Sequence, residues 1–273
     1  MQIFHLEGHE DSFLPDGKWK LVWNDEFDGT ELDRTKWDYR LSMMGKIHPA
    51  WTDKGVHIDG KSNAVFSLLE ENGIPVSSQL QTGYNFMDQP TIPTTFGCDH
   101  LQWNIGKLHE NLFTHRYGYY ECRCRLQQHP EAWWSAFWMQ SPIIGASLDP
   151  AETGSELDIM ECFDTGKIVA HNAFTGGYGQ DMKRAFAGGM EGLDPKEFHR
   201  FGMYWDESGY TFYVDGIEDG HISEYVSKRP EFILISTEVK GYRFKEHIAV
   251  KEAYDVIGKD DFLVDYVRVF DAE

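Results

Sequence analysis

Apolar and polar residues alternate along several short stretches of the chain, which is the pattern of half-buried β-strands. Strands are predicted on this ground at residues 117–126, 210–214, 232–237 and 262–270. The second of these ends in Asp215-Gly216, a pair typical of a two-residue hairpin turn. Helical periodicity is rare, and residues 245–257 are the one moderate helix candidate. Many short strands joined by glycine-containing turns predict an all-β sandwich of two antiparallel sheets.

The sequence shows no sign of a division into domains. Its 273 residues contain no internal repeat, low-complexity run or linker rich in proline and serine. A chain of this length can bury one large core, and β-sandwiches reach this size as single domains. We therefore expect one domain over residues 1–273.

Charge and aromatic content narrow the possible partners. Asp and Glu number 45 against 25 Lys and Arg, which gives a formal net charge of −20. Such a surface repels phosphate backbones and anionic lipid, so neither nucleic acid nor a membrane surface is expected as a partner. It also disfavours polyanionic polysaccharides, unless the charge lies far from the binding cleft. Aromatic residues make up 15% of the chain, which fits either a strand-rich core or a cleft that stacks on sugar rings.

Cysteine usage and the N-terminus bear on the environment of the protein. Cys98, Cys122, Cys124 and Cys162 are expected to be free thiols, because a chain of this size does not depend on disulfides. No spacing suggests a zinc site. No signal peptide or membrane span is predicted, so the chain as written is expected to be cytoplasmic. A monomer is also expected. It would be secreted if a leader had been removed ahead of Met1.

The common catalytic motifs are missing from the sequence. It contains no Gly-x-Gly-x-x-Gly, no Walker loop, no Gly-x-Ser-x-Gly elbow and no His-Glu-x-x-His pair. These absences argue against the usual nucleotide-binding, serine-hydrolase and zinc-protease functions.

Residues 154–163 place three carboxylates, Glu156, Asp158 and Glu161, among apolar residues. Side chains alternate along a strand, so Glu156 and Asp158 share a face and Glu161 has the opposite parity. One extra residue around Ile159-Met160, a β-bulge, would bring Glu161 to the same face.

Three carboxylates on one face suggest acid–base chemistry. Two glutamates leaning together can approach the ~5–5.5 Å separation of a retaining glycosidase. Asp158 between them disfavours ionisation of all three groups and keeps one glutamate protonated as a general acid. The residues alone leave two alternatives open, an acidic solvated strand face and a calcium site.

A tryptophan-rich stretch at residues 133–139 lies just upstream and can pair with the acidic strand. Trp134 and Trp138 share one parity, and Phe137 and Met139 share the other. One set is therefore expected to face the core and the other a cleft, where a tryptophan can stack on sugar rings. A wholly buried stretch is the alternative.

Together these segments resemble glycoside hydrolase family 16, which includes laminarinases, lichenases, agarases, porphyranases and κ-carrageenases. Residues 156–161 resemble its signature Glu-x-Asp-x-x-Glu in the bulged form. Other segments resemble family patterns at residues 23–29, 116–123, 134–139, 198–205, 212–216 and 264–270. The family-like region covers about residues 19–271, which leaves residues 1–18 as an N-terminal extension.

The resemblance implies a β-jelly-roll sandwich whose concave sheet carries the substrate cleft. It implies a retaining glycoside hydrolase with Glu156 as nucleophile and Glu161 as general acid/base, while Asp158 orients and tunes Glu156. Trp138 is expected beneath the cleaved sugar, and Trp134 is expected to line the cleft.

Further expectations from the resemblance concern substrate and metal. His171 is expected to face the cleft, and no cofactor is required. A structural calcium far from catalysis is a further possibility, for which Asp265 and residues near Asp25 are candidates.

The substrate is less constrained by the sequence. Residues 234–239 depart from the laminarinase pattern and look more like the Thr-Glu segment of agarase-type members, so Glu238 contacts either a sugar or a salt-bridge partner. Residues 43–51 and 85–103 look like chain-specific loops, where Trp51, Tyr84 and Trp103 are expected to fence the cleft.

A neutral β-linked polysaccharide or oligosaccharide is the expected substrate, with β-1,3-glucan first. A galactan-type hydrolase and a transglycosylase are the alternatives within the family. A non-catalytic carbohydrate-binding module is disfavoured, because none of the three carboxylates is lost.

Overall fold

The fold is described from a computed structural model of the chain. It describes residues 1–95, 102–106, 109–164, 168–177, 179–243 and 246–273. For residues 91–95, 102–106, 164, 168 and 169 the description is limited to the backbone.

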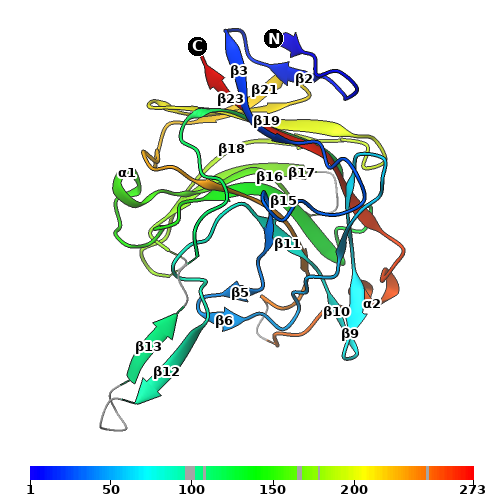
Figure 1. The fold of residues 1–273 in the computed structure, drawn as a ribbon, viewed down its shortest axis with the longest axis vertical. Coiled ribbons are helices and arrows are strands. Elements are labelled where there is room, and N and C mark those ends of the chain that lie inside the picture. The colour runs from blue at the N-terminus through cyan, green and yellow to red at the C-terminus, as the bar shows by residue number, and fades with distance from the viewer. Residues whose placement is uncertain (96–101, 107–108, 165–167, 178, 244–245) are drawn as a thin grey trace.

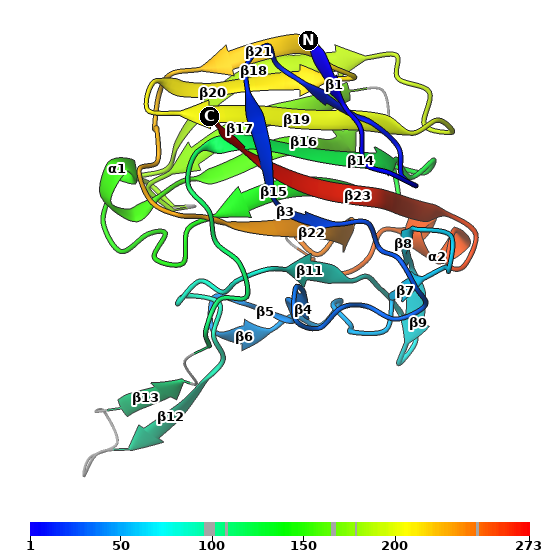
Figure 2. The same ribbon diagram turned by 45° about the horizontal axis from the view of Figure 1, so that its top comes forward.

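Two large antiparallel sheets form the body of the molecule and lie as two stacked layers (Figures 1 and 2). The seven-stranded sheet has the order β18 (Lys183–Glu191), β17 (Ile168–Thr175), β16 (Glu156–Asp164), β15 (Trp133–Gln140), β22 (Phe232–Val239), β11 (Gln79–Gln81) and β4 (Asp38–Tyr39). The eight-stranded sheet has the order β21 (Ile217–Ile222), β20 (Gly209–Val214), β19 (His199–Asp206), β14 (Gly118–Arg125), β23 (Asp261–Ala272), β8 (Ala64–Ser67) and β7 (Val56–Ile58), and β3 (Trp19–Asp25) also pairs with β23. The predicted all-β sandwich of two antiparallel sheets is therefore confirmed.

Short hairpins and two short helices complete the described fold. The hairpins are β1 (Gln2–Phe4) with β2 (Ser12–Leu14), β5 (Ser42–Met43) with β6 (Lys46–Ile47), β9 (Leu69–Glu71) with β10 (Ile74–Val76), and β12 (Thr91–Thr95) with β13 (Gln102–Gly106). The helices are α1 (Pro150–Thr153) and α2 (Lys251–Asp255). The hairpin of β12 and β13 extends away from the two layers (Figure 1). None of the described helices is long and apolar enough to cross a membrane.

The core lies between the two large sheets, where the apolar side of each strand meets the other layer. Side chains from both sheets are fully buried there, among them Phe137, Met139, Leu157, Ile235, Tyr120, Phe212 and Val267. Burial of this apolar surface is the main favourable term in folding. Because these side chains take one face of each strand, the residues between them face away from the core.

The four strands expected from alternation are all present, within one to two residues at each end, as β14, β20, β22 and β23. The predicted turn at Asp215-Gly216 joins β20 to β21, and both residues have positive φ, 50° and 78°. A type I′ turn needs this conformation at both central positions. The described cysteines, Cys122, Cys124 and Cys162, are buried free thiols as predicted, and Cys98 lies outside the described residues.

Two expectations about irregular segments need correction. The helix candidate at residues 245–257 contains only the five residues of α2, which has no side-chain cap at its N-terminus and a single buried residue, Ala253. The stretches 43–51 and 85–103 are not plain loops, since they contain the β5–β6 hairpin and most of the β12–β13 hairpin.

The N-terminal extension folds onto the eight-stranded sheet. Strands β1 and β2 pair with each other, and Leu14 packs against Tyr119 and Phe270 of that sheet. The other face of the sandwich, on the seven-stranded sheet, is thereby left free of the extension. That free face carries the acidic strand.

Candidate active site

Strand β16 carries all three predicted carboxylates to one face of the seven-stranded sheet. Phe137 of β15 pairs with Met160, and the next residue, Trp138, pairs with Asp158, so Ile159 is one residue too many on β16. The pairing with β17 shifts at the same place, between Asp158 and Glu161. The predicted β-bulge is confirmed, and it gives Glu161 the same facing as Glu156 and Asp158.

The opposite side of β16 is buried in the core. Leu157, Ile159, Met160 and Cys162 are all fully inaccessible to solvent. This packing fixes the register of the strand, because a slip of one residue would bury the carboxylates. An acidic solvated strand face, one of the alternatives left open by the sequence, does not describe this site, since Glu156 is only 9% exposed and Asp158 only 6%.

The three carboxylates line a single cavity of about 260 Å³. Its other walls come from β15, β22, β11 and the segment around the β5–β6 hairpin, and include Arg40, Met43, Met44, Gln79, Trp134, Ala136, Trp138, Ser236, Glu238 and Arg243. Acid, amide, hydroxyl and aromatic groups therefore converge on one concave site, as small-molecule and sugar sites require.

Glu156 is held by a chain of hydrogen bonds that begins in a loop. Gln140 donates from Nε2 to Glu156 Oε2 at 2.7 Å, and Asn85 Nδ2 donates to Gln140 Oε1 at 2.9 Å. Asn85 Nδ2 also donates to Asp88 Oδ2, which accepts from Arg40 Nε at 2.8 Å. Because every residue in this series of hydrogen bonds is buried, the series restricts the position of the Glu156 carboxylate.

Asn172 of β17 links the other two carboxylates. Its Nδ2 donates to Asp158 Oδ2 at 3.1 Å and to Glu161 Oε2 at 3.2 Å. Asn172 is fully buried and pairs with Asp158 in the sheet. Asn172 was not identified as a site residue from the sequence, and its neighbour His171 was named instead. Adjacent residues of a strand face opposite sides, so only one of these two can face the carboxylates, and this alternation could have indicated Asn172.

Burial and mutual repulsion raise the pKa values of two of the carboxyls. The pKa of Asp158 lies well above its ordinary value, first because of burial and then because of the charges of Glu161 and Glu156. The pKa of Glu161 is also raised, by burial and by Glu156, against the opposing effect of Arg243 and Arg184. This environment shifts Glu161 toward its protonated form, the form that a general acid requires.

Trp134 and Trp138 face the cavity, whereas Phe137 and Met139 face the core, as the alternation of β15 predicts. Trp138 Nε1 donates to Ser236 Oγ at 2.9 Å, which fixes the orientation of the ring. The Arg40 guanidinium lies 5.2 Å from the Trp138 ring centroid. Trp138 therefore forms part of the cavity wall beside the carboxylates.

Glu238 also lines the cavity and is paired with Arg243. Arg243 donates from Nε to Glu238 Oε1 at 2.9 Å and from Nη2 to Oε2 at 2.7 Å, a two-point ion pair. The same guanidinium lies 5.1 Å from the ring centroid of Trp134. Glu238 thus lines the cavity and forms a salt bridge, and its contact with a sugar stays a prediction.

His171 does not face the cleft, and that expectation was wrong. It is fully buried and stacks on Phe212 of the eight-stranded sheet, with the ring centroids 4.7 Å apart. Its Nδ1 lies 2.6 Å from the carbonyl oxygen of Ile159, the extra residue of the bulge. His171 therefore lies between the sheets beneath the bulge, because its neighbour Asn172 takes the outward position.

Trp51 and Tyr84, two of the three residues expected to fence the cleft, do not line the cavity. Trp51 is 6% exposed and lies behind Arg40, whose guanidinium is 5.1 Å from its ring centroid. Tyr84 donates its hydroxyl to Asp38 Oδ2 at 2.6 Å. Trp51 therefore contacts a wall residue from outside the cavity, and Tyr84 is bonded to a residue that is not part of the wall. The side chain of Trp103 lies outside the described residues.

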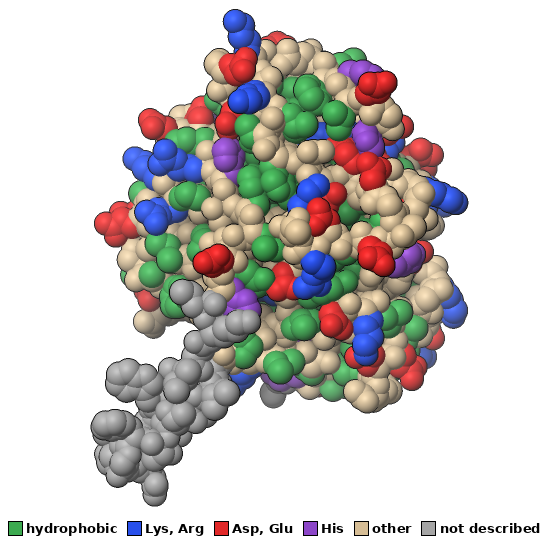
Figure 3. Space-filling model, in the orientation of Figure 1, with side chains coloured by type: hydrophobic (Ala, Val, Ile, Leu, Met, Phe, Trp, Pro, Cys, Tyr) green, Lys and Arg blue, Asp and Glu red, His purple; other side chains and the backbone are tan. Residues whose placement is uncertain are grey.

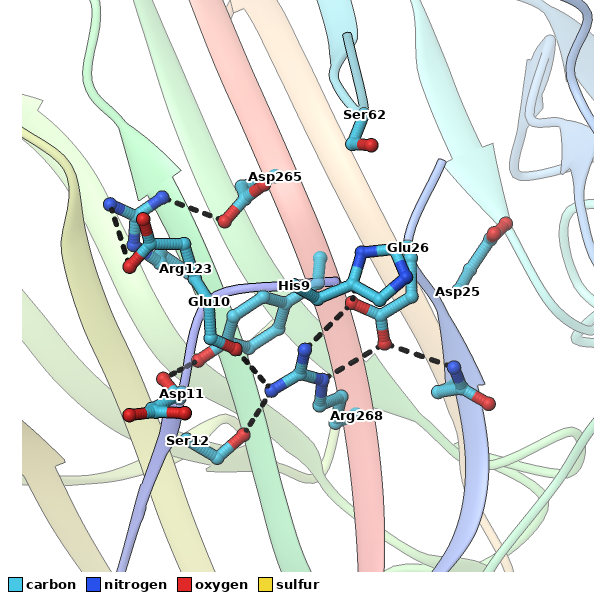
Figure 4. Close-up of polar contacts among 12 residues, drawn as sticks. His9, Glu10, Asp11, Ser12, Asp25, Glu26, Ser62, Arg123, Asp265 and Arg268 are labelled. Atoms are coloured by element: carbon cyan, nitrogen blue, oxygen red, sulfur yellow. Dashed lines mark hydrogen bonds and ion pairs between the residues drawn. The ribbon is translucent and has the colours of Figure 1, made fainter. Parts of the chain in front are cut away.

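The carboxylates considered for a structural calcium are bonded to protein donors. Arg123 Nη1 donates to Asp265 Oδ2 at 2.7 Å, and Arg268 binds both oxygens of Glu26 at 2.8–2.9 Å. Figure 4 shows the Arg123 guanidinium next to Asp265 and Glu10, while Asp25 points away from them. Asp25 accepts from Trp37 Nε1 at 2.7 Å.

These contacts do not fit a calcium site. Calcium takes six to eight oxygen ligands, and a neighbouring guanidinium competes for the carboxylates. Over the ranges the structure describes, no group of three or more His, Cys, Asp or Glu residues is arranged to hold a metal ion. The calcium expectation near Asp265 and Asp25 is therefore not carried further.

The acidic side chains on one face of the molecule can be seen in Figure 3. On the face shown in Figure 3, acidic side chains are distributed among Lys and Arg, with no broad area of one sign. The net charge of −20 is therefore not concentrated into one acidic patch on this face.

The family model and the two similar proteins described here are all glycoside hydrolases. Residues 46–232 match the family model described as glycosyl hydrolases family 16. The chain is 24% identical over 206 residues to a glucan endo-1,3-beta-glucosidase A1 of Niallia circulans, matching 72% of this chain but only 28% of that protein. It is 24% identical over 230 residues to beta-porphyranase B of Zobellia galactanivorans, matching 78% of this chain and 71% of that protein.

The fold itself is found in solved structures. SCLam, a non-specific endo-beta-1,3(4)-glucanase, is 20% identical, with 97% of this chain and 96% of that chain covered and a TM-score of 0.66. A mutant of SCLam holds 1,3-beta-D-cellobiosyl-glucose at its active site. The likeness to SCLam shows that the sandwich described above is the jelly roll of that enzyme class.

Proposed function

The chain belongs to glycoside hydrolase family 16, a family of retaining enzymes, and we propose that it hydrolyses β-glycosidic bonds of a neutral glycan, with β-1,3-glucan as the first candidate. Glu156 attacks the anomeric carbon while Glu161 protonates the departing glycosidic oxygen. Water then attacks the glycosyl-enzyme, with Glu161 acting as base. Asp158 lies between them and limits how many of the three carry charge at once.

The observation that carries this proposal is the convergence of the three carboxylates on the floor of one cavity. The roles follow from their different surroundings. Glu156 accepts a 2.7 Å hydrogen bond from the Gln140 amide, which favours a carboxylate ready for attack. Burial and the charge of Glu156 raise the pKa of Glu161, which favours a proton on the acid.

A neutral substrate is supported by the pairing of the cations around the cavity. Arg40 forms an ion pair with Asp88 at 2.6 Å, and Arg243 with Glu238 at 2.7 Å. Each guanidinium charge is thus balanced by a carboxylate. The similarity to the Niallia circulans glucanase and to SCLam supports a β-1,3-linked glucan within this class.

A galactan-type substrate is the second candidate, and one observation favours it. The Arg243 side chain is 57% exposed although it is paired with Glu238. An exposed guanidinium at a cleft wall can receive an anionic substituent on two oxygens. The similarity to a beta-porphyranase supports the same candidate.

A substrate panel tests the proposal directly. The protein is incubated with laminarin, a mixed-linkage β-glucan, agarose, porphyran and κ-carrageenan, and the products are sized. We expect laminarin to be cleaved fastest. Preferred cleavage of porphyran or agarose would favour the galactan candidate, and products longer than the substrate at high acceptor concentration would indicate transglycosylation. Glu156→Ser is the control and should release no product from any glycan.

A further inference from the structure

Arg184 and Asn172 form a second layer of contacts behind the acidic residues. Arg184 of β18 donates to Asn172 Oδ1 from Nε at 3.0 Å and from Nη2 at 2.5 Å. Asn172 in turn donates to Asp158 and Glu161 from its Nδ2. A continuous path of hydrogen bonds therefore runs from an exposed guanidinium to the general acid.

The direction of each bond along this path is fixed by chemistry. A guanidinium only donates hydrogen bonds, so the oxygen of the Asn172 amide has to face Arg184. The NH2 end is then turned to the carboxylates, and its two hydrogens match its two acceptors. With the amide reversed, its oxygen would face two carboxyl groups and its NH2 would face the guanidinium. Arg184 thus determines which end of the amide the acid receives.

Arg184 is itself held in place by two aromatic rings. Its guanidinium lies 5.2 Å from the Phe174 ring centroid and 5.7 Å from that of Phe186. Phe174 lies opposite Arg184 in the pairing of β17 with β18, and Phe186 lies opposite Asn172. The contacts with both rings restrict the guanidinium to the position from which it reaches Asn172.

We propose that Arg184 and Asn172 are positioning residues that orient the Glu161 carboxyl and set the pH range over which it serves as general acid. Neither residue forms a bond with substrate in this proposal; they act through Glu161. The proposal rests on the proposed function, since it takes Glu161 as the acid.

The charges that face Glu161 come from several elements. Glu156 and Asp158 lie on its own strand, Glu238 on β22, Arg184 on β18, and Arg243 on the segment that follows β22. The carboxylates Glu156 and Glu238 raise the pKa of Glu161, and the two guanidinium groups lower it. Loss of Arg184 should therefore raise this pKa further, and the acid should keep its proton to higher pH.

The test compares Arg184→Ala with Lys183→Ala. Lys183 is the preceding residue of β18, is exposed, and points to the opposite face of the strand. The substitution Lys183→Ala therefore removes the same charge as Arg184→Ala without affecting the contact with Asn172. The dependence of kcat/KM on pH is measured on the glycan that is cleaved fastest. For Arg184→Ala we expect the alkaline limb to move up by about half a pH unit or more. Lys183→Ala should leave that limb in place.

Two further variants separate positioning from general damage. Arg184→Lys keeps the charge but loses the two-point contact, so its alkaline limb should lie closer to that of the wild type. Asn172→Ala should reduce turnover of the glycan more than turnover of an aryl glycoside whose leaving group departs without protonation. Equal losses on the two substrates would indicate a merely structural role and overturn the proposal for Asn172.

The failure of this proposal is distinguishable from the failure of the proposed function. If Glu161→Gln keeps near-normal hydrolysis of the glycan, the assignment of the acid is wrong. If Glu161→Gln is inactive but Arg184→Ala and Lys183→Ala give the same alkaline limb, Glu161 remains the acid and the role of Arg184 is refuted.

Discussion

Two groups of carboxylates, one at each large sheet, have different partners. In the eight-stranded sheet, Arg268 is fully buried and binds both oxygens of Glu26, and Arg123 binds Asp265. In the seven-stranded sheet, neutral amides contact the three carboxylates of β16: Gln140 donates to Glu156, and Asn172 donates to Asp158 and Glu161.

The difference separates a structural role from a chemical one. A guanidinium partner favours the charged form of a carboxylate and occupies its acceptor oxygens, although burial outweighs Arg123 and raises the pKa of Asp265. An amide donor orients a carboxyl group without supplying a full charge, so neighbouring carboxyls raise each other's pKa values and can exchange protons with a substrate. Glu26, with its guanidinium partner, thus stabilises the fold, whereas the carboxylates of β16, with their amide partners, are available for catalysis.

Removal of the general acid should give the largest effect. Glu161→Gln keeps the size of the side chain but cannot transfer a proton, so kcat on the glycan should fall by about 10²–10⁴-fold. Stability to urea should stay the same or rise, because one of three crowded acidic groups is removed. Glu218→Gln, on the exposed face of β21, is the control and should keep full activity. Retained activity in Glu161→Gln would break the distinction between the two sheets.

Removal of the buried guanidinium of Arg268 should reduce stability and leave activity unchanged. Arg268→Met leaves Glu26 buried without its partner, so the free energy of unfolding should fall by about 3–5 kcal/mol. The activity of the folded fraction should be unchanged, because Arg268 lies on the other sheet. Urea unfolding followed by tryptophan fluorescence measures the loss. A loss below about 1 kcal/mol would show that the pair is not structural.

The buried carboxyl of Glu231 should make the stability of the fold depend on pH. It is fully buried and accepts from the backbone N–H of Ser155, the residue before Glu156, and burial raises its pKa to about 8. In the unfolded chain this group ionises near its ordinary pKa of 4.5, so the folded state holds the proton more tightly. Its contribution to stability is therefore fully present below pH 4.5 and is lost as the pH rises to about 8.

Replacement of this glutamate should remove that loss. Glu231→Gln is uncharged at every pH, so its stability relative to the wild type should increase between pH 5 and pH 8.5. The increase amounts to a few kcal/mol, because each pKa unit corresponds to about 1.4 kcal/mol. Glu207→Gln, in an exposed turn, should show no such trend. The same difference at the two pH values would refute the burial argument for Glu231.

Much of the fold and the centre of the site follow from the sequence. Alternation and β-prone residues predicted β14, β20, β22 and β23, although β22 is buried along its whole length and β14 along most of its length. The parity argument also predicted the bulge at Ile159, since the three carboxylates of β16 could share a face in no other way. These features depend on period and spacing, which a single sequence contains.

The remaining site residues depend on contacts between distant segments. His171 and Asn172 are adjacent, and only the pairing of β17 with β16 decides which of them faces the carboxylates. Trp51 is turned toward Arg40, and Asp265 is paired with Arg123, 142 residues away. Such pairings are set by tertiary packing, so the pattern of one segment does not reveal them.

The identity of the nucleophile is the most direct point at which to test the site. A 2-deoxy-2-fluoro β-glucosyl fluoride, extended by a β-1,3-linked glucose, forms a long-lived glycosyl-enzyme in a retaining enzyme. Digestion of the labelled protein and mass spectrometry then locate the added sugar. We predict a single label on Glu156. A label on Asp158 or Glu161 would contradict the assigned roles.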